Sequence, residues 1–172
     1  WAGGLGDLAF GIKRVVAASL ATGSIVSVMG EVSAPTGRYD RGLGAGTAMF
    51  EGSVLAAQLI TASVFVQLHA GAAAAYDRSF PDEAFARIAL GEQIVPVRFG
   101  RMISPIVELT ATRELDGGAP TEIDVLPELQ VTLSARQHIR AAAAVQVPVT
   151  ERSSRETAAL VYLLWDIADG GL

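Results

Sequence analysis

Two runs of alternating apolar and polar residues, joined by an Asp-Gly-Gly turn, constrain this chain more than any other feature. In the first run Val107, Leu109 and Ala111 alternate with polar residues, and the second run follows residues 115–118. In the second run the apolar residues form one set and the polar residues form the other. The apolar set is Ile123, Val125, Leu129, Val131 and Leu133, and the polar set is Glu122, Asp124, Glu128, Gln130 and Thr132. A period of two indicates strands with one apolar and one polar face, and Asp-Gly-Gly between them indicates a hairpin.

The length of these runs suits a membrane as well as a soluble sheet. About ten residues, at ~3.3 Å rise and a tilt of ~45°, span roughly 25 Å of bilayer. A soluble sheet with one wet face has the same alternation, so the hairpin alone leaves both possibilities open.

The rest of the chain repeats the pattern and predicts about nine strands in one all-β unit. We expect them at residues 5–16, 24–33, 45–56, 62–75, 83–90, from 107, 122–133, 140–149 and 157–167. For the last strand the pattern does not show which side chains point to which face, because residues 160–165 are apolar throughout. Short connections alternate with longer, more charged ones, which is typical of bacterial outer-membrane barrels. An odd strand count and a first residue that is Trp1 suggest that N-terminal strands are missing.

Composition excludes several classes of protein. The 172 residues allow one domain with a sizeable core, and no shift in composition divides residues 1–172. Because the chain has no cysteine, it has no disulfides, no thiolate metal site and no covalently attached haem of its own. Its 13 Lys and Arg against 18 Asp and Glu argue against a nucleic-acid surface.

Residues 52–76 lack charge and are long enough for a membrane helix. Gln58, Thr61, Ser63, Gln67 and His69 interrupt the segment, however, and a lipid-facing helix would place them on several sides. We therefore interpret it as two strands with a turn at 58–61, in which Val64, Val66, Leu68 and Ala70 share one face.

Several motifs resemble the outer-membrane transporters of the phenol-degradation meta-pathway type. They are GLGDLAFGIKR at 4–14, VSAPTG at 32–37, GLGAGTAMFEGSVLAAQ at 42–58, FVQLHAGAAAAY at 65–76, SPIVELTATRELDGG at 104–118 and LPELQVTLSARQHIRAAAAVQVPVTE at 126–151. The resemblance covers nearly the whole chain. It implies an antiparallel up-and-down transmembrane β-barrel of about 12 strands, an even number as bacterial barrels have, nine or ten of them in this chain. It further implies an outer membrane of a Gram-negative bacterium, contact with lipid and lipopolysaccharide, and hydrophobic aromatic solutes; no set of functional residues comes with it.

Candidate chemistry is sparse. The segment GLGAGT at 42–47 lacks the lysine of a phosphate-binding loop and runs into a strand, so its glycines are interpreted as loop residues. His69 shares a face with Ser63, but six residues along a strand separate them by roughly 20 Å, which is too far for a hydrogen bond. His138 is expected in a solvated turn. We predict no enzyme activity, no cofactor and no metal site.

The polar faces of the expected strands supply the candidate site residues. In a membrane barrel they face the lumen, because the lipid side penalises charge. They are Asp7, Lys13, Glu31, Glu51, Gln67, His69, Arg87, Glu108, Asp124, Glu128 and Arg140. Two interpretations stay open: an interior plugged by ion pairs, or a polar channel whose acidic bias favours cations. Aromatic residues expected at strand ends (Tyr76, Phe99, Tyr162 and Trp165) suit either interfacial girdles or core packing.

The sequence therefore predicts a porin-like barrel that passes small, aromatic or hydrophobic molecules without chemistry. One alternative is a structural barrel that sheathes or anchors a periplasmic partner, such as a multihaem cytochrome conduit. Another is a soluble β-sandwich or lipocalin-like binding protein, which would have to cover the apolar bands with a second sheet.

Overall fold

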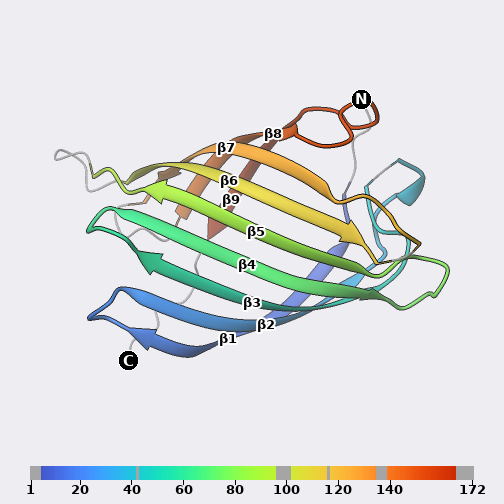
Figure 1. Ribbon diagram of the computed structural model, residues 1–172, viewed down its shortest axis with the longest axis horizontal. Helices are drawn as coiled ribbons and strands as arrows, with labels where there is room; N and C mark the ends of the chain where they lie inside the picture. Colours follow the sequence, from blue (N-terminus) through green and yellow to red (C-terminus); the bar gives the residue numbers. More distant parts are fainter. Residues whose placement is uncertain (1–4, 42, 96–101, 116, 135–138, 166–172) are drawn as a thin grey trace. The chain divides into compact units, whose positions relative to one another are not determined.

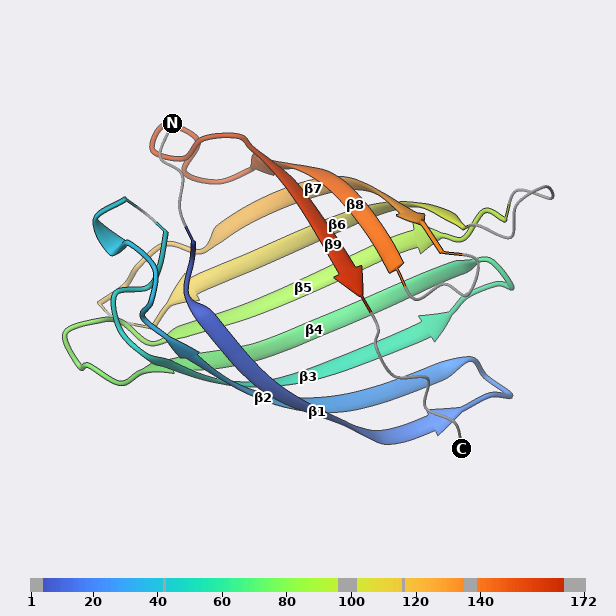
Figure 2. The ribbon, with the colours of Figure 1, turned by 180° about the vertical axis from the view of Figure 1, so that it is seen from behind.

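The structure, a computed structural model, is all-β. It describes residues 5–41, 43–95, 102–115, 117–134 and 139–165. Nine antiparallel strands follow one another up and down in a single sheet, in the order of the chain (Figure 1). Their bounds are β1 Leu8–Ser19, β2 Ser24–Ala34, β3 Met49–Leu59, β4 Val64–Ala75, β5 Glu83–Glu92, β6 Ile103–Glu114, β7 Glu122–Thr132, β8 Ile139–Pro148 and β9 Ala158–Trp165. The short 3-10 helix η1, Tyr39–Arg41, lies in the loop between β2 and β3 (Figure 2).

The nine expected strands are all present, and the interpretation of residues 52–76 as two strands instead of a membrane helix is confirmed, because this segment contributes to β3 and β4. Among the described residues no helix has the length and apolar character needed to span a membrane. Within the same residues β1 pairs only with β2 and β9 only with β8, so the sheet is not closed.

Some strand ends differ from the expected ones. The turn after β3 lies at 60–63 rather than 58–61, because the backbone N–H groups of Ile60 and Thr61 both donate to the Val64 carbonyl. β3 begins at Met49 rather than Ala45, and β1 begins at Leu8 rather than Leu5. Local alternation continues into these loop residues, but Ala45 N donates to the Asp7 carboxylate and the Gly6 carbonyl accepts from the Thr36 hydroxyl, so these backbone groups bond to side chains.

Contacts divide the chain into two compact units. The first contains residues 1–57, 68–86 and 111–121, and the second contains residues 58–67, 87–110 and 122–172. The first unit includes β1 and β2, which pair from Leu8–Ala34 to Ser19–Ser24 with a register shift between Val15 and Ala17. The second includes β7, β8 and β9, in which the register brings Gln130, Ala142 and Tyr162 into one cross-strand row.

The two faces of the strands differ in an unusual sense: the more exposed face is the apolar one. Large aliphatic side chains on this apolar face are each 39–55% exposed: Val28, Val54, Leu68, Ile88, Val107, Leu109, Leu129, Val145 and Val147. The opposite face, called here the polar face, contains buried polar side chains: Ser27, Ser53, Ser104, Asp124 and Thr132. Only small residues and Phe65 make up the buried hydrophobic set among the described residues. Soluble domains normally show the reverse distribution.

Candidate functional site

A cavity of about 390 Å³ lies on the polar face of the second unit. Its volume is in the range of small-molecule sites. Strands β4 to β9 all contribute to it. The polar lining residues are Gln67, Gln93, Ser104, Glu108, Glu128, Gln130, Arg140 and Tyr162; the apolar ones are Phe65, Ala89, Met102 and Ile106. Two carboxylates, one guanidinium and three side-chain amides therefore face the same space.

Tyr162 crosses a neighbouring strand to reach this cavity. Its partner in the β8–β9 register is Ala142, which is 3% exposed, and the next residue on that face is Ala144, at 6%. Adjacent strands are ~4.8 Å apart, so a long side chain lying over two alanines spans β8. The Tyr162 hydroxyl donates to Glu128 Oε1 over 2.5 Å, and Gln130 Nε2 donates to the hydroxyl oxygen over 3.4 Å.

The facing of β9, which the sequence left open, follows from this register. Tyr162 lies on the polar face, whereas Val161, Leu163 and Trp165 lie on the apolar face and are 65–82% exposed. Tyr162 was expected at a strand end, and this is wrong: it lies within β9, and its hydroxyl is bonded to a carboxylate.

Two further polar clusters lie in the first unit. Glu31, Glu51 and Glu83 line a cavity of about 200 Å³. His69 Nε2 lies 3.8 Å from Glu51 Oε1, and its ring packs edge-on against Phe85 with ring centroids 5.0 Å apart. These contacts place His69 among carboxylate and aromatic neighbours. In the described part of the chain no group of three His, Asp or Glu side chains is arranged to hold a metal ion.

Asp7 connects the start of β1 to the long loop between β2 and β3. Its Oδ1 accepts a hydrogen bond from Gly37 N over 2.8 Å, and its Oδ2 accepts one from Ala45 N over 2.7 Å. A Cβ at Gly44 would lie 2.5 Å from Asp7 Oδ1, and one at Gly46, where φ is +78°, would lie 2.9 Å from the Tyr39 ring. The glycines of GLGAGT thus allow close approach and a left-handed turn.

The geometry around Asp7 gives a pH prediction. The N–H of Ala45, and to a lesser extent that of Gly37, lowers the pKa of Asp7 from its ordinary value of ~3.9. Because the pKa of Asp7 is lower in the folded state, its hydrogen bonds stabilise the folded protein fully above about pH 3.9. This contribution is lost as the pH falls through the folded-state pKa. In an NMR titration, the backbone amide chemical shifts of Gly37 and Ala45 should change together below about pH 3.9.

Asp7→Asn should abolish that shared titration, whereas Asp40→Asn, which removes an exposed carboxylate paired with Arg38 in the same loop, should leave it intact. Independent titration of the two amides in the unaltered chain would contradict the prediction.

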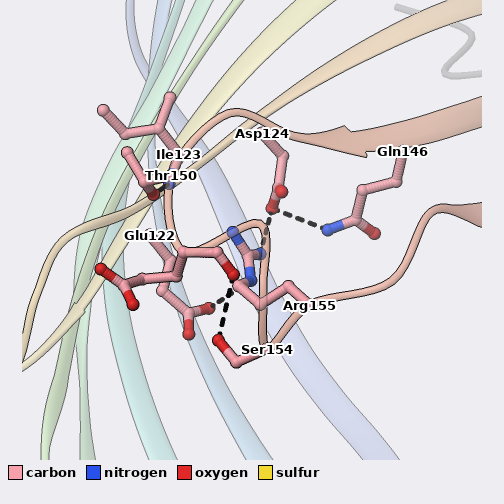
Figure 3. Close-up of polar contacts among 8 residues, drawn as sticks. Glu122, Ile123, Asp124, Gln146, Thr150, Ser154 and Arg155 are labelled. Carbon is pink, nitrogen blue, oxygen red and sulfur yellow. Dashed lines mark hydrogen bonds and ion pairs between the residues drawn. The ribbon is translucent and has the colours of Figure 1, made fainter.

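Arg155, in the loop after β8, binds to the start of β7 (Figure 3). Its Nη2 lies 2.6 Å from Asp124 Oδ2, and its Nε lies 3.3 Å from Glu122 Oε2. Gln146 Nε2 donates to the same Asp124 oxygen over 2.7 Å. The hydrogen bond with Asp124 raises the pKa of Arg155 still further, so this guanidinium stays charged at any pH of interest.

The predicted site residues fall into several structural groups. Glu108, Glu128 and Arg140 come together at the 390 Å³ cavity with Gln67, while Glu31, Glu51 and His69 gather in the first unit. Asp124 is buried against Arg155, and Asp7 binds a loop. Lys13 and Arg87 are largely exposed. His138 and Phe99 lie outside the described residues.

Sequence reasoning did not single out Ser104 or Arg155, and it named Tyr162 only as an aromatic residue at a strand end. The four consecutive alanines at 141–144 were a usable signal for Tyr162, since small residues leave room for a side chain from the next strand. No local sequence pattern predicted the contact of Arg155, because its partner Asp124 is 31 positions away in the chain. Comparison of the chain with known protein families, with characterised proteins and with solved structures finds no match.

Proposed function

We propose that this chain forms the wall of a bacterial outer-membrane β-barrel that lets small molecules pass without chemistry. The observation that carries the proposal is the reversed sidedness of the strands: aliphatic side chains are exposed on one face, and polar side chains are buried on the other. In water, an apolar face of this extent needs a covering layer. In a bilayer, hydrocarbon covers it, and the polar face belongs to a lumen.

Strand dimensions support the same proposal. The first eight strands contain 10 to 12 residues each. At ~3.3 Å per residue and a tilt of ~45°, such strands cross roughly 25 Å, the height of the apolar band of outer-membrane barrels. The resemblance of the sequence to phenol-degradation outer-membrane transporters agrees with this interpretation and suggests small aromatic solutes.

Purification tests the membrane assignment first. A barrel should require detergent for extraction and should migrate faster on a gel before heating than after it. Solubility without detergent would favour the soluble β-sandwich or lipocalin-like alternative. Stoichiometric co-purification of a multihaem cytochrome, with no solute flux into liposomes that contain this chain alone, would favour the alternative of a structural barrel that sheathes a partner.

Ion selectivity tests the role of the polar face. In a planar bilayer with a salt gradient, carboxylates in the lumen should make the channel cation-selective. We expect the double variant Glu108→Gln/Glu128→Gln to reduce the cation-over-anion permeability ratio severalfold, so that the reversal potential moves toward zero. Glu114→Gln, at the exposed end of β6 and outside the cavity, is the matched control. An unchanged reversal potential in the double variant, or no conductance from the unaltered protein, would overturn the channel role.

A further inference from the structure

We propose that Arg14 binds the phosphate group of a glycerophospholipid on the apolar face of β1. This inference deepens the proposed membrane function and rests on it. Arg14 lies on the apolar face, because the register pairs it with Val28, which belongs to that face. The other charged residues on this face of the described strands are Glu92 and Arg113, at the last position of β5 and the next-to-last position of β6. Within the described strands, Arg14 is therefore the charged side chain that lies in the interior of the apolar face.

A charge at this place needs a partner. Arg14 is exposed, and within the described residues no hydrogen bond or ion pair reaches it. A guanidinium group in hydrocarbon is unfavourable, so arginine side chains on a lipid face extend toward the polar headgroups. The anion at that level is phosphate, which guanidinium binds through two parallel hydrogen bonds. Such a contact would offset the cost of placing Arg14 on this face.

The distance from Arg14 to the end of its hairpin allows this contact. From the Arg14–Val28 pair to the end of the ladder, β2 runs only from Val28 to Ser24. At ~3.3 Å per residue and a tilt of ~45°, the Arg14 Cα lies roughly 9 Å from that end of the strands. The register shift between Val15 and Ala17 gives β1 one extra residue there, and bulges re-aim the side chains next to them. An extended arginine side chain covers most of the remaining distance.

The connection at this end of the strands selects the source of the phosphate. Residues 20–23 join β1 to β2, whereas residues 35–48 join β2 to β3. In outer-membrane barrels short turns lie on the periplasmic side, and longer loops lie on the outer side. The leaflet nearest to Arg14 is therefore the periplasmic one, which consists of glycerophospholipids rather than lipopolysaccharide.

Apolar residues next to Arg14 suit the acyl chains of the same lipid. Phe10 and Ile12 precede Arg14 on this face and are 75% and 70% exposed. They lie on the side of Arg14 away from the turn, which is the direction in which acyl chains extend into the bilayer. Gly30, the partner of Ile12 on β2, has no side chain to cover this surface. One lipid thus meets the guanidinium with its phosphate and the apolar row with its chains.

Three lipids with the same dioleoyl chains test the site: phosphatidylglycerol, phosphatidylcholine and dioleoylglycerol, which has no phosphate. Each lipid is titrated into the folded protein in a nonionic detergent, and native mass spectrometry measures how much lipid stays bound. We expect phosphatidylglycerol to bind at least about tenfold more tightly than dioleoylglycerol, because hydrogen bonds between charged groups are the stronger ones. Phosphatidylcholine, whose own ammonium group balances its phosphate, should fall between them.

Arg14→Gln should weaken the binding of phosphatidylglycerol about tenfold and leave that of dioleoylglycerol unchanged. Lys13→Gln is the matched control, because Lys13 is the next residue of β1, pairs with Met29 and lies on the opposite face. It removes the same charge and should leave the binding of all three lipids unchanged. Heat-modifiable migration of each variant confirms that it is folded.

Equal binding of phosphatidylglycerol and dioleoylglycerol would overturn the proposal, as would undiminished phosphatidylglycerol binding in the folded Arg14→Gln variant. An equal loss in Lys13→Gln would also overturn it, since net charge rather than the position of Arg14 would then control binding. Stronger Arg14-dependent binding of lipopolysaccharide than of phosphatidylglycerol would overturn the choice of leaflet. Extraction without detergent would refute the membrane function itself. A protein that requires detergent but binds the three lipids equally would refute this inference alone.

Discussion

Leu109→Lys should destabilise the folded protein in lipid vesicles by about 2–4 kcal/mol, the cost of a lysine on the lipid face of an outer-membrane barrel near the bilayer midplane. Leu109 lies near the middle of β6 and is 44% exposed, on the same face as Val107. If that face contacts hydrocarbon, the ammonium group must leave water to occupy it. Urea unfolding in vesicles, followed by heat-modifiable migration, measures the free energy of unfolding.

Thr110→Lys is the matched control, because Thr110 is the next residue of β6 and points to the opposite face. It should cost clearly less than Leu109→Lys, since the polar face already accommodates charge. If Leu109→Lys changed the stability by less than about 0.5 kcal/mol, as surface substitutions in water usually do, the apolar face would be solvated and the membrane proposal would fail.

Arg155→Met should lower the free energy of unfolding by about 3 kcal/mol, because removing one partner leaves a buried charge uncompensated. Asp124 is 4% exposed, and without the guanidinium the Gln146 amide would be the only side chain among the described residues that still donates to Asp124 Oδ2. The loop that follows β8 would also lose the ion pairs of Arg155 with Glu122 and Asp124 (Figure 3), while the hydrogen bonds of Val149 and Thr150 to Ile123 would remain. The same unfolding measurement in vesicles reports the loss.

Arg152→Met, in the same loop, is the control. Arg152 is exposed and, among the described residues, donates only to the Val149 carbonyl. Its substitution should change the free energy of unfolding by less than about 0.5 kcal/mol. The double variant Asp124→Asn/Arg155→Met should recover most of the stability, because the uncompensated carboxylate is gone. If Arg155→Met were no worse than Arg152→Met, the contact with Asp124 would contribute nothing to stability.

The sequence alone predicted the nine strands and the side to which most of their residues point. Both follow from a period of two, which is a local property of an extended chain with one apolar and one polar face. Val107, Leu109 and Leu129 accordingly share the exposed face, and Glu108 and Glu128 share the other. Strand ends were less well predicted, as at residues 45–48, because an apolar residue in a loop continues the alternation without joining the ladder.

Only the tertiary structure decided which polar side chains meet. Tyr162 reaches Glu128 because the register of β7, β8 and β9 places two small alanines between them, and Arg155 reaches Asp124 because a loop folds back onto an earlier strand. Such contacts depend on register, loop path and side-chain volume together, and none of these is encoded in the local alternation. The cavity lined by Glu108, Glu128 and Arg140 belongs to this second category.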